Sequence, residues 1–329
     1  MFRYTFGLLM LPALVVCGSS CRNEKISYKL SRGGYSPSTN TLLLLVRVDL
    51  GEPLKGSFLA TYDEEKGSLT HLLYPTISGT CDFAWAPGQA IFVVTHSDRM
   101  TLFQKDPTSE RGYSGTAIRC PVNALYMFCS WNPKGEWLAV NCFDLEKGCH
   151  RLGLYDLKEE KCVISDILMD AGCPPVWKDD ATLYVTSDNN IVEVRVESGV
   201  PRLVRTIPIE EGEWAAIFYG MFDDRALVLR YKEIKLGNKT LVELDRATRN
   251  RVITTDTTIF VSACSTNLVA FDHEGREIDR TNPGRTIYFG SIGKDPNTVY
   301  GLADSVLLRI RVENGRLNIH QVCDLAGFE

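Results

Sequence analysis

Cysteines are the residues of this chain with the most evident chemistry. The chain has 11 cysteines; nine follow Cys21, and seven gather between residues 81 and 173: Cys81, Cys120, Cys129, Cys142, Cys149, Cys162 and Cys173. Cys142 and Cys149 flank a polar turn between two expected strands, which predicts a disulfide bridge across a hairpin if the chain is exported to an oxidising compartment. The alternative is that most of these cysteines are small, buried apolar side chains. Because nine is an odd number, at least one thiol stays unpaired or pairs outside the chain.

Neither a metal site nor a catalytic site follows from the spacing of the other reactive residues. A metal could use Cys142, Cys149 and His150, but the chain has no Cys-x-x-Cys pair and no two histidines at ligand spacing. Gly290-Ser291-Ile292-Gly293 lacks the Gly-x-Ser-x-Gly spacing of a hydrolase nucleophile, and no phosphate-binding or dinucleotide-binding motif is present. We therefore predict no metal, no cofactor and no catalytic residue, while the sequence leaves open whether the protein is an enzyme.

One aromatic residue lies in an acidic stretch that could bind a ligand. Trp214 directly follows Glu210-Glu211-Gly212-Glu213. An aromatic ring beside carboxylates can stack on a sugar or hold a cationic peptide group. The alternative is that Trp214 forms an apolar lid over a channel.

Charge and hydropathy exclude several classes of protein. The formal net charge is −5, and Lys and Arg form no run, which argues against binding to nucleic acid or to a membrane through a basic patch. After the first 20 residues no stretch contains 18 consecutive apolar residues, so no transmembrane helix is expected. Long amphipathic helical patterns are missing, and turns rich in Gly, Asn and Asp recur along the chain. The sequence therefore predicts an all-β protein.

A repeat of 46 residues positions the expected strands. Trp85, Trp131 and Trp177 are separated by 46 residues, twice in succession, and each is followed by a short apolar run and a polar turn. A repeat of about 40–50 residues made of short strands is typical of a β-propeller blade. A tryptophan at this place is expected to pack between neighbouring blades.

A second repeat extends the blades to the end of the chain. The segment from Lys178 to Gly199 matches the segment from Lys294 to Gly315 at an offset of 116 residues, so 286–323 is expected to be a blade. We predict a single propeller of seven blades; six or eight would follow if the short unit at 259–280 or the N-terminal unit is misread. Residues 25–31 alternate apolar and polar, and we expect this N-terminal strand to close the last blade beside residues 317–323.

Turns and blade openings resemble two known kinds of propeller repeat. Tyr155-Asp156 ends an expected strand before a tight turn, which resembles the closing dipeptide of WD40 repeats. Trp131-Asn132-Pro133-Lys134-Gly135 resembles the Trp-x-Pro-x-Gly opening of the WD40-like repeats of the TolB propeller. The resemblance covers most of the chain after the N-terminal signal and implies a fold rather than an activity.

The N-terminus resembles a bacterial lipoprotein signal. Residues 6–16 are apolar but too few to span a bilayer, and Gly18-Ser19-Ser20 precedes Cys21. This resemblance implies a signal peptide at 1–20 and a lipid on Cys21, and Arg22 after it favours the outer membrane. The alternative is an ordinary signal peptide. The expected domains are a tether and ring-closing strand at 21–34 and the propeller at 35–329.

Propellers bind ligands on the loops that join the outer strand of one blade to the inner strand of the next. Such loops carry the binding candidates of this chain: Tyr35, Asp82, Tyr126, Glu211, Trp214 and Arg285. We expect a lipid-anchored, non-catalytic binding platform of the cell envelope whose partner is an envelope protein or a glycan. The alternative is a hydrolase or lyase that acts on carbohydrate from charged loops at the channel mouth.

Overall fold

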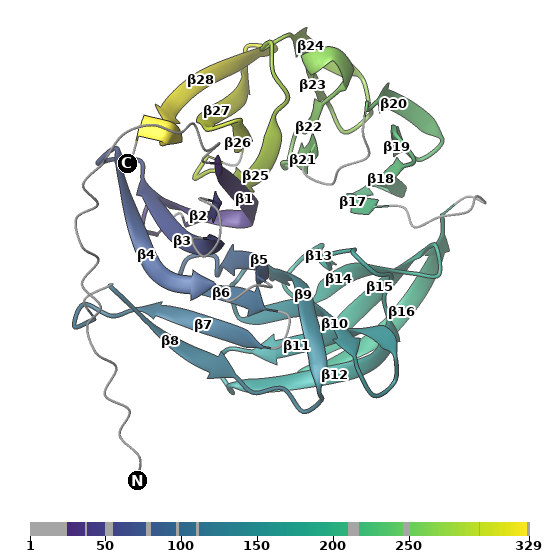
Figure 1. The fold of residues 1–329 in the computed structure, drawn as a ribbon. Coiled ribbons are helices and arrows are strands. Elements are labelled where there is room, and N and C mark those ends of the chain that lie inside the picture. The colour runs from purple at the N-terminus through teal and green to yellow at the C-terminus, as the bar shows by residue number, and fades with distance from the viewer. Residues whose placement is uncertain are drawn as a thin grey trace.

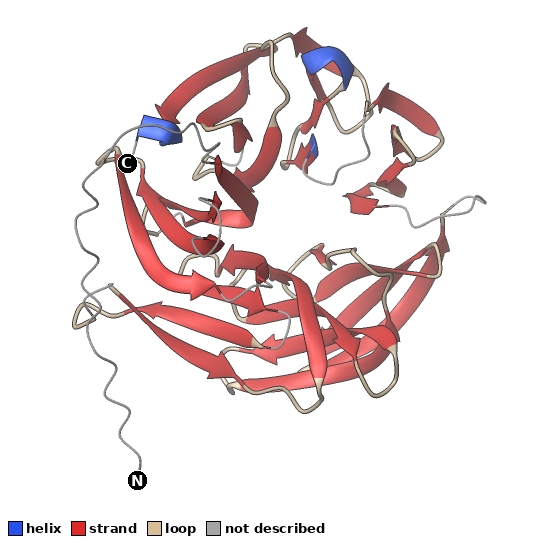
Figure 2. Ribbon diagram, in the orientation of Figure 1, coloured by secondary structure: helices blue, strands red, loops and turns tan. Residues whose placement is uncertain are grey.

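The computed structural model describes residues 25–36, 38–49, 55–76, 80–96, 99–109, 112–209, 217–245, 251–295 and 297–327. Within these residues the strands form seven antiparallel sheets of four strands each, arranged as a ring (Figure 1). The predicted all-β propeller with seven blades is therefore confirmed. Figure 2 shows strands throughout the ring, with short 3₁₀ turns such as η2 (Cys264–Thr266) and η3 (Leu325–Gly327). This part of the chain contains no helix that is long and apolar enough to cross a membrane.

Each blade consists of four strands that follow one another along the chain, from the inner edge to the outer edge. The first blade contains β1 (Lys25–Ser36), β2 (Thr41–Asp49), β3 (Lys55–Asp63) and β4 (Ser68–Thr76). The second contains β5 (Thr80–Trp85), β6 (Ile91–His96), β7 (Met100–Lys105) and β8 (Tyr113–Ile118). The third contains β9 (Ala124–Trp131), β10 (Trp137–Asp144), β11 (Cys149–Asp156) and β12 (Lys161–Leu168).

The remaining blades repeat this arrangement. The fourth contains β13 (Val176–Trp177), β14 (Thr182–Ser187), β15 (Asn190–Glu197) and β16 (Val200–Pro208). The fifth contains β17 (Ile217–Phe222), β18 (Arg225–Arg230), β19 (Glu233–Leu236) and β20 (Lys239–Glu243). The sixth contains β21 (Val252–Thr254), β22 (Ile259–Ser262), β23 (Leu268–Phe271) and β24 (Glu277–Thr281). The seventh contains β25 (Tyr288–Ile292), β26 (Thr298–Ala303), β27 (Val306–Glu313) and β28 (Arg316–Asp324).

The hydrophobic core lies between the blades, because the apolar strands are covered on both faces. In β2, Leu42 and Leu44 belong to a cluster with Tyr300 of the seventh blade. Leu43, between them, belongs to a cluster with Trp85 of the second blade. Successive side chains of a strand point to opposite faces, so a continuous apolar run is what a strand with a neighbour on each side requires.

Two of the three repeated tryptophans, Trp131 and Trp177, donate a hydrogen bond to the blade before their own. The Trp131 indole Nε1–H donates a hydrogen bond to the Ala84 carbonyl oxygen at 3.2 Å, and Trp177 donates in the same way to the Ser130 carbonyl at 3.0 Å. Trp131 is buried in an apolar cluster formed by the second and third blades. The 46-residue period thus sets a contact that recurs between blades, as the sequence predicts.

The repeat at an offset of 116 residues is also structural, because it joins strands at the same places in the fourth and seventh blades. Ser198 and Gly199 form the two-residue loop between β15 and β16, and both have positive φ (49° and 78°). Asn314 and Gly315 form the corresponding loop between β27 and β28, with φ of 52° and 71°. Two successive positive φ angles give a type I′ turn, whose twist matches that of the strands it joins.

The predicted way of closing the ring was wrong. β1 pairs with β2 from Lys25↔Asp49 to Leu30↔Leu44 and again from Tyr35↔Leu42 to Ser36↔Thr41, with a shift of register between the two stretches, and is the inner strand of the first blade. Within the described residues β28 pairs with β27 and with no other strand, so the seventh blade uses its own four strands. The ring instead closes by packing of the first blade against the seventh, with β1 beside β25. β1 begins at Lys25, so residues 25–34, which the sequence assigns to a tether and ring-closing strand, belong to the inner strand of the first blade.

Candidate functional site

The predicted binding residue Tyr35 lies in β1 and links the first blade to the seventh. Its ring stacks on Tyr300, with 5.5 Å between the ring centroids and 24° between the planes. Its backbone N–H donates to the Ser291 hydroxyl at 2.8 Å, and its phenol donates to the Asn40 side-chain oxygen. Burial raises the pKa of Tyr35, so its hydroxyl stays a hydrogen-bond donor. Tyr35 is buried and thus holds the first and seventh blades together.

The predicted binding residues Asp82 and Tyr126 are also buried between blades. Asp82 is in β5, and its Oδ2 accepts a hydrogen bond from the Cys129 backbone N–H of the third blade at 3.4 Å. Tyr126 is in β9 and packs in the apolar cluster between the second and third blades; this burial raises its pKa. Both residues therefore position neighbouring blades rather than project over the channel.

The other predicted residues are not brought to the same place by the part of the chain that the structure describes. Arg285 is exposed in the connection between β24 and β25. Glu211, Trp214 and Cys21 lie outside the described residues. The predicted ligand residues thus do not form one constellation among the described positions.

Cys142 and Cys149, between which the sequence predicts a bridge, are free thiols in this structure, as are Cys120 and Cys162. Cys142 lies opposite Arg151 and Cys149 lies opposite Asp144, so the two cysteines are diagonal neighbours on the hairpin. Diagonal positions are about 7–8 Å apart, whereas a disulfide requires Cα atoms within about 7 Å. Burial also raises the pKa of Cys142. In the described residues, no group of three or more His, Cys, Asp or Glu side chains could hold a metal ion.

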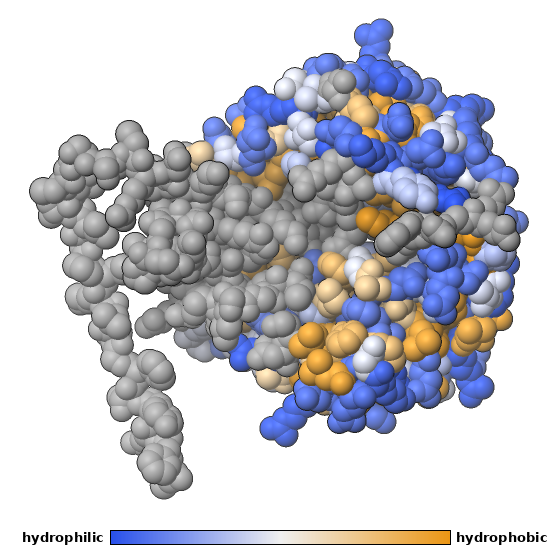
Figure 3. Space-filling view, turned by 45° about the vertical axis from the view of Figure 1, so that its right-hand side comes forward, coloured by the Kyte–Doolittle hydropathy of each residue, from blue (hydrophilic) through white to orange (hydrophobic). Residues whose placement is uncertain are grey.

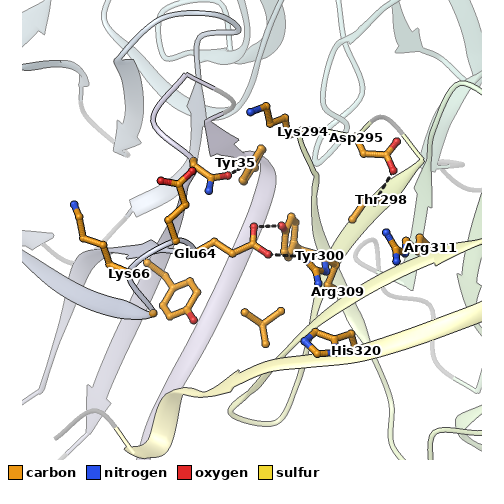
Figure 4. A pocket seen from close by; sticks show the side chains of 15 residues that line it. Tyr35, Glu64, Lys66, Lys294, Asp295, Thr298, Tyr300, Arg309, Arg311 and His320 are labelled. Carbon is orange, nitrogen blue, oxygen red and sulfur yellow. Dashed lines mark hydrogen bonds and ion pairs between the residues drawn. The ribbon is translucent and has the colours of Figure 1, made fainter.

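A polar groove of about 880 Å³ lies where the first and last blades meet, and we call it the seam groove. Figure 4 shows Glu64, from the turn after β3, reaching across the groove to Tyr300 of β26 and Arg309 of β27. The Arg309 Nη1–H donates to Glu64 Oε1 at 2.9 Å, and the Tyr300 hydroxyl donates to Glu64 Oε2. Tyr300 and Arg309 lie 236 and 245 positions after Glu64 in the sequence. One carboxylate thus joins the two ends of the ring.

The carboxylate, phenol and guanidinium at the centre of the seam groove are hydrogen-bonded to one another. Burial and the Glu64 carboxylate raise the pKa of Tyr300, so this phenol remains protonated and donates its hydrogen bond. Arg309 neutralises the charge of Glu64, and Arg311 at the rim pairs with Glu313 at 2.7 Å. This arrangement supports closure of the ring through a partly buried hydrogen-bond network. Nothing in the local sequence identifies Glu64 or Arg309, because their partners are distant; only the 116-residue repeat points to Tyr300, as the counterpart of Tyr184.

A second groove lies between the outer strands of the third and fourth blades, and we call it the outer groove. It measures about 560 Å³ and is lined by residues of β12 and β16 and their neighbours: Val163, Ile164, Ser165, Asp166, Ile167, Leu168, Ser187, Val192, Val200, Pro201 and Leu203. Leu168, Val200 and Leu203 are 47%, 51% and 58% exposed. In the lower half of Figure 3, orange apolar residues gather among blue hydrophilic ones on the side of these blades. The outer groove is therefore an aliphatic surface that faces solvent.

The negative charge in the outer groove is balanced by ion pairs within the chain. Asp166 is the one charged residue among those that line it. Its carboxylate accepts from Arg151 Nη2 at 2.6 Å and from Lys147 Nζ at 3.2 Å. A partner that enters the groove therefore meets aliphatic side chains and no uncompensated charge. The sequence shows the apolar residues of both strands but not that these strands lie on the outer edge.

Comparison with solved structures agrees with this geometry. The structure of U3-55K superimposes with a TM-score of 0.57 at 13% identity, over 77% of this chain and 83% of that chain. The RRP9 WD40 repeats give a TM-score of 0.53 at 12% identity, over 77% and 82%. Kluyveromyces lactis Hsv2p gives 0.54 at 9% identity, over 89% and 96%. This chain has a WD40-like propeller fold. At these identities the likeness concerns the fold alone, and no family model and no curated protein matches the chain.

The WD40-like closing dipeptide has a local physical role in this propeller. Asp156, at the end of β11, accepts hydrogen bonds on Oδ1 from the backbone N–H groups of Lys158 and Glu159 at 2.9 and 3.1 Å. Asp63, at the end of β3, caps its turn in the same way. An aspartate at this place fixes the tight turn because its carboxylate replaces a backbone acceptor.

Proposed function

We propose that this protein is a non-catalytic binding platform of the cell envelope, and that a protein partner docks in its outer groove. The observation that carries the proposal is the exposure of Leu168, Val200 and Leu203 along two adjoining outer strands. Contiguous exposed apolar surface on a soluble domain marks an interaction site. Covering it gains about 25 cal/mol for each Å² of apolar surface removed from water.

The chemistry of the outer groove favours a partner with an apolar face. Asp166 is compensated within the chain, so an ionic partner would gain little there. β16 also carries a β-bulge, because Glu193 pairs with Arg205 while Val194 pairs with Leu203. Bulges in outer strands disfavour the addition of a further strand. The partner is therefore expected to insert side chains into the groove rather than extend the sheet.

The proposed lipid on Cys21 would hold this platform close to a membrane. A lipid on Cys21 would be joined to Lys25, where β1 begins, by a segment of at most about 14 Å, since extended chain spans about 3.3–3.6 Å per residue.

The seam groove supports the non-catalytic part of the proposal, because Glu64, Tyr300 and Arg309 are hydrogen-bonded to one another.

Two aspartates in the outer groove are expected to abolish partner binding. The double variant Val200→Asp/Leu203→Asp introduces two charges into an aliphatic surface, and Tyr231→Asp is the matched control because Tyr231 is 61% exposed on the fifth blade. The measurement is quantitative co-isolation of proteins with the full-length chain from the membrane fraction. A protein retained by the wild type and by Tyr231→Asp should be lost from the double variant, without loss of thermal stability.

The same experiment separates docking from anchoring through the variant Cys21→Ala. This variant is expected to leave the membrane fraction yet to bind the partner in solution. Identical sets of retained proteins for the wild type and the groove variant would contradict docking in the outer groove, and an unchanged membrane fraction for Cys21→Ala would contradict the lipid anchor.

A further inference from the structure

Two cysteines that are distant in the sequence meet between the second and third blades. Cys120 follows β8, the outer strand of the second blade, and Cys162 lies in β12, the outer strand of the third. Their Sγ atoms are 2.7 Å apart although the residues are 42 positions apart in sequence. A disulfide bond is about 2.05 Å long, so the two sulfurs need to approach by less than about 1 Å to form one.

The surroundings of the pair favour a structural bond rather than a ligand site. Cys162 is buried beside Tyr155 in the apolar cluster between these blades, and Cys120 packs against the same cluster from its rim. Cys162 pairs with Tyr155 in the sheet, which fixes its backbone. Cys120 lies in a connection between blades, where small backbone shifts are tolerated. One sulfur is thus held in place while the other can move to it.

We propose that Cys120 and Cys162 form a disulfide bridge that joins the second blade to the third under oxidising conditions. It differs from the bridge expected at Cys142 and Cys149 and rests on a separate observation from the docking proposal. The bridge closes a loop of the chain that contains the whole of β9, β10 and β11. It also tethers the start of β12, whose following residues line the outer groove.

The reaction requires a disulfide oxidant, for which oxidised glutathione serves. The hydrogen bond with Cys162 lowers the pKa of the Cys120 thiol, and Cys120 is the more exposed of the two, so the Cys120 thiolate attacks one sulfur of the oxidant. This step forms a mixed disulfide and releases one glutathione thiolate. Cys162 then loses its proton, attacks the Cys120 sulfur and releases the second glutathione. Two protein thiols are oxidised while one glutathione disulfide is reduced to two thiols.

Mass spectrometry of the full-length chain tests the proposal. The protein is incubated with oxidised glutathione, alkylated and digested without reduction, and a peptide pair linked through Cys120 and Cys162 is expected. Oxidation should raise the melting temperature by about 5 °C, because the bridge closes a long loop in the unfolded chain. This rise should vanish in both Cys120→Ser and Cys162→Ser and persist in the control Cys149→Ser.

Three results would overturn the assignment. The first is recovery of Cys120 and Cys162 in alkylated form after oxidation. The second is a linked pair that joins either of them to another cysteine, such as the buried Cys142. The third is a rise in melting temperature that remains in Cys120→Ser.

Discussion

Replacing Trp131 with alanine is expected to lower the free energy of unfolding by about 3–5 kcal/mol, the usual effect of removing a large buried aromatic side chain. Trp131 fills the space between the second and third blades. Its indole also donates the hydrogen bond to the Ala84 carbonyl that joins these blades. The variant loses both the packing and the hydrogen bond, and the core between blades cannot collapse without moving a whole sheet. Urea unfolding followed by fluorescence measures the change.

Two variants separate packing from the general effect of losing a tryptophan. Trp131→Phe retains most of the apolar volume but loses the hydrogen bond, so its cost should be intermediate. Trp137 is only partly buried, at the start of β10, and Trp137→Ala should cost about 1 kcal/mol. If Trp131→Ala is no more destabilising than Trp137→Ala, the tryptophan repeat does not hold the blades together.

The variant Tyr300→Ala is expected to destabilise the protein by about 3–5 kcal/mol and to open the ring. Tyr300 stacks on Tyr35 of the first blade and donates its hydroxyl to Glu64. Its loss leaves Glu64 with Arg309 as its remaining partner from the seventh blade. Opening exposes the apolar cluster around Leu42 and Leu44, so the variant should form oligomers on size-exclusion chromatography.

The repeat within the chain supplies the control for this experiment. Tyr184 occupies the equivalent place in the fourth blade and packs on Phe218 of the fifth. Tyr184 and Tyr300 are equally buried, at 3% and 2% exposure, so Tyr184→Ala should destabilise the protein without opening the ring. Tyr300→Phe keeps the stacked ring and should cost about 1.5–3 kcal/mol for the hydrogen bond lost to a charged carboxylate. Equal oligomer formation by Tyr184→Ala and Tyr300→Ala would contradict a special role for the seam.

The architecture was predictable because the contacts that define a blade recur at a fixed spacing. The 46-residue tryptophan period and the 116-residue match correspond to positions with the same contacts in successive or distant blades. The partner of the N-terminal strand was not predictable. Alternation of Ile26, Tyr28 and Leu30 predicts a strand with one covered face, but it does not indicate which strand pairs along its edge.

The candidate site was harder to predict, because the boundary between loop and strand decides whether a residue is exposed. The sequence predicts that Tyr35, Asp82 and Tyr126 lie in loops, but they lie in the inner strands β1, β5 and β9 and are buried between blades. The Cys142–Cys149 prediction rests on spacing in the sequence alone. Proximity in sequence suggested a bridge, whereas strand register places the two cysteines diagonally and blade packing brings Cys120 to Cys162 instead.

The most direct test of the docking proposal is site-specific photo-cross-linking in the native envelope. A photoreactive benzoylphenylalanine at position 203 is expected to give a protein adduct of one defined mass. The adduct should disappear when Val200→Asp is added, because the partner then no longer enters the outer groove. The same probe at position 231, which is equally exposed on another blade, should give no such adduct. Adducts to lipid alone, or the same protein adducts from both positions, would contradict a protein partner bound in the outer groove.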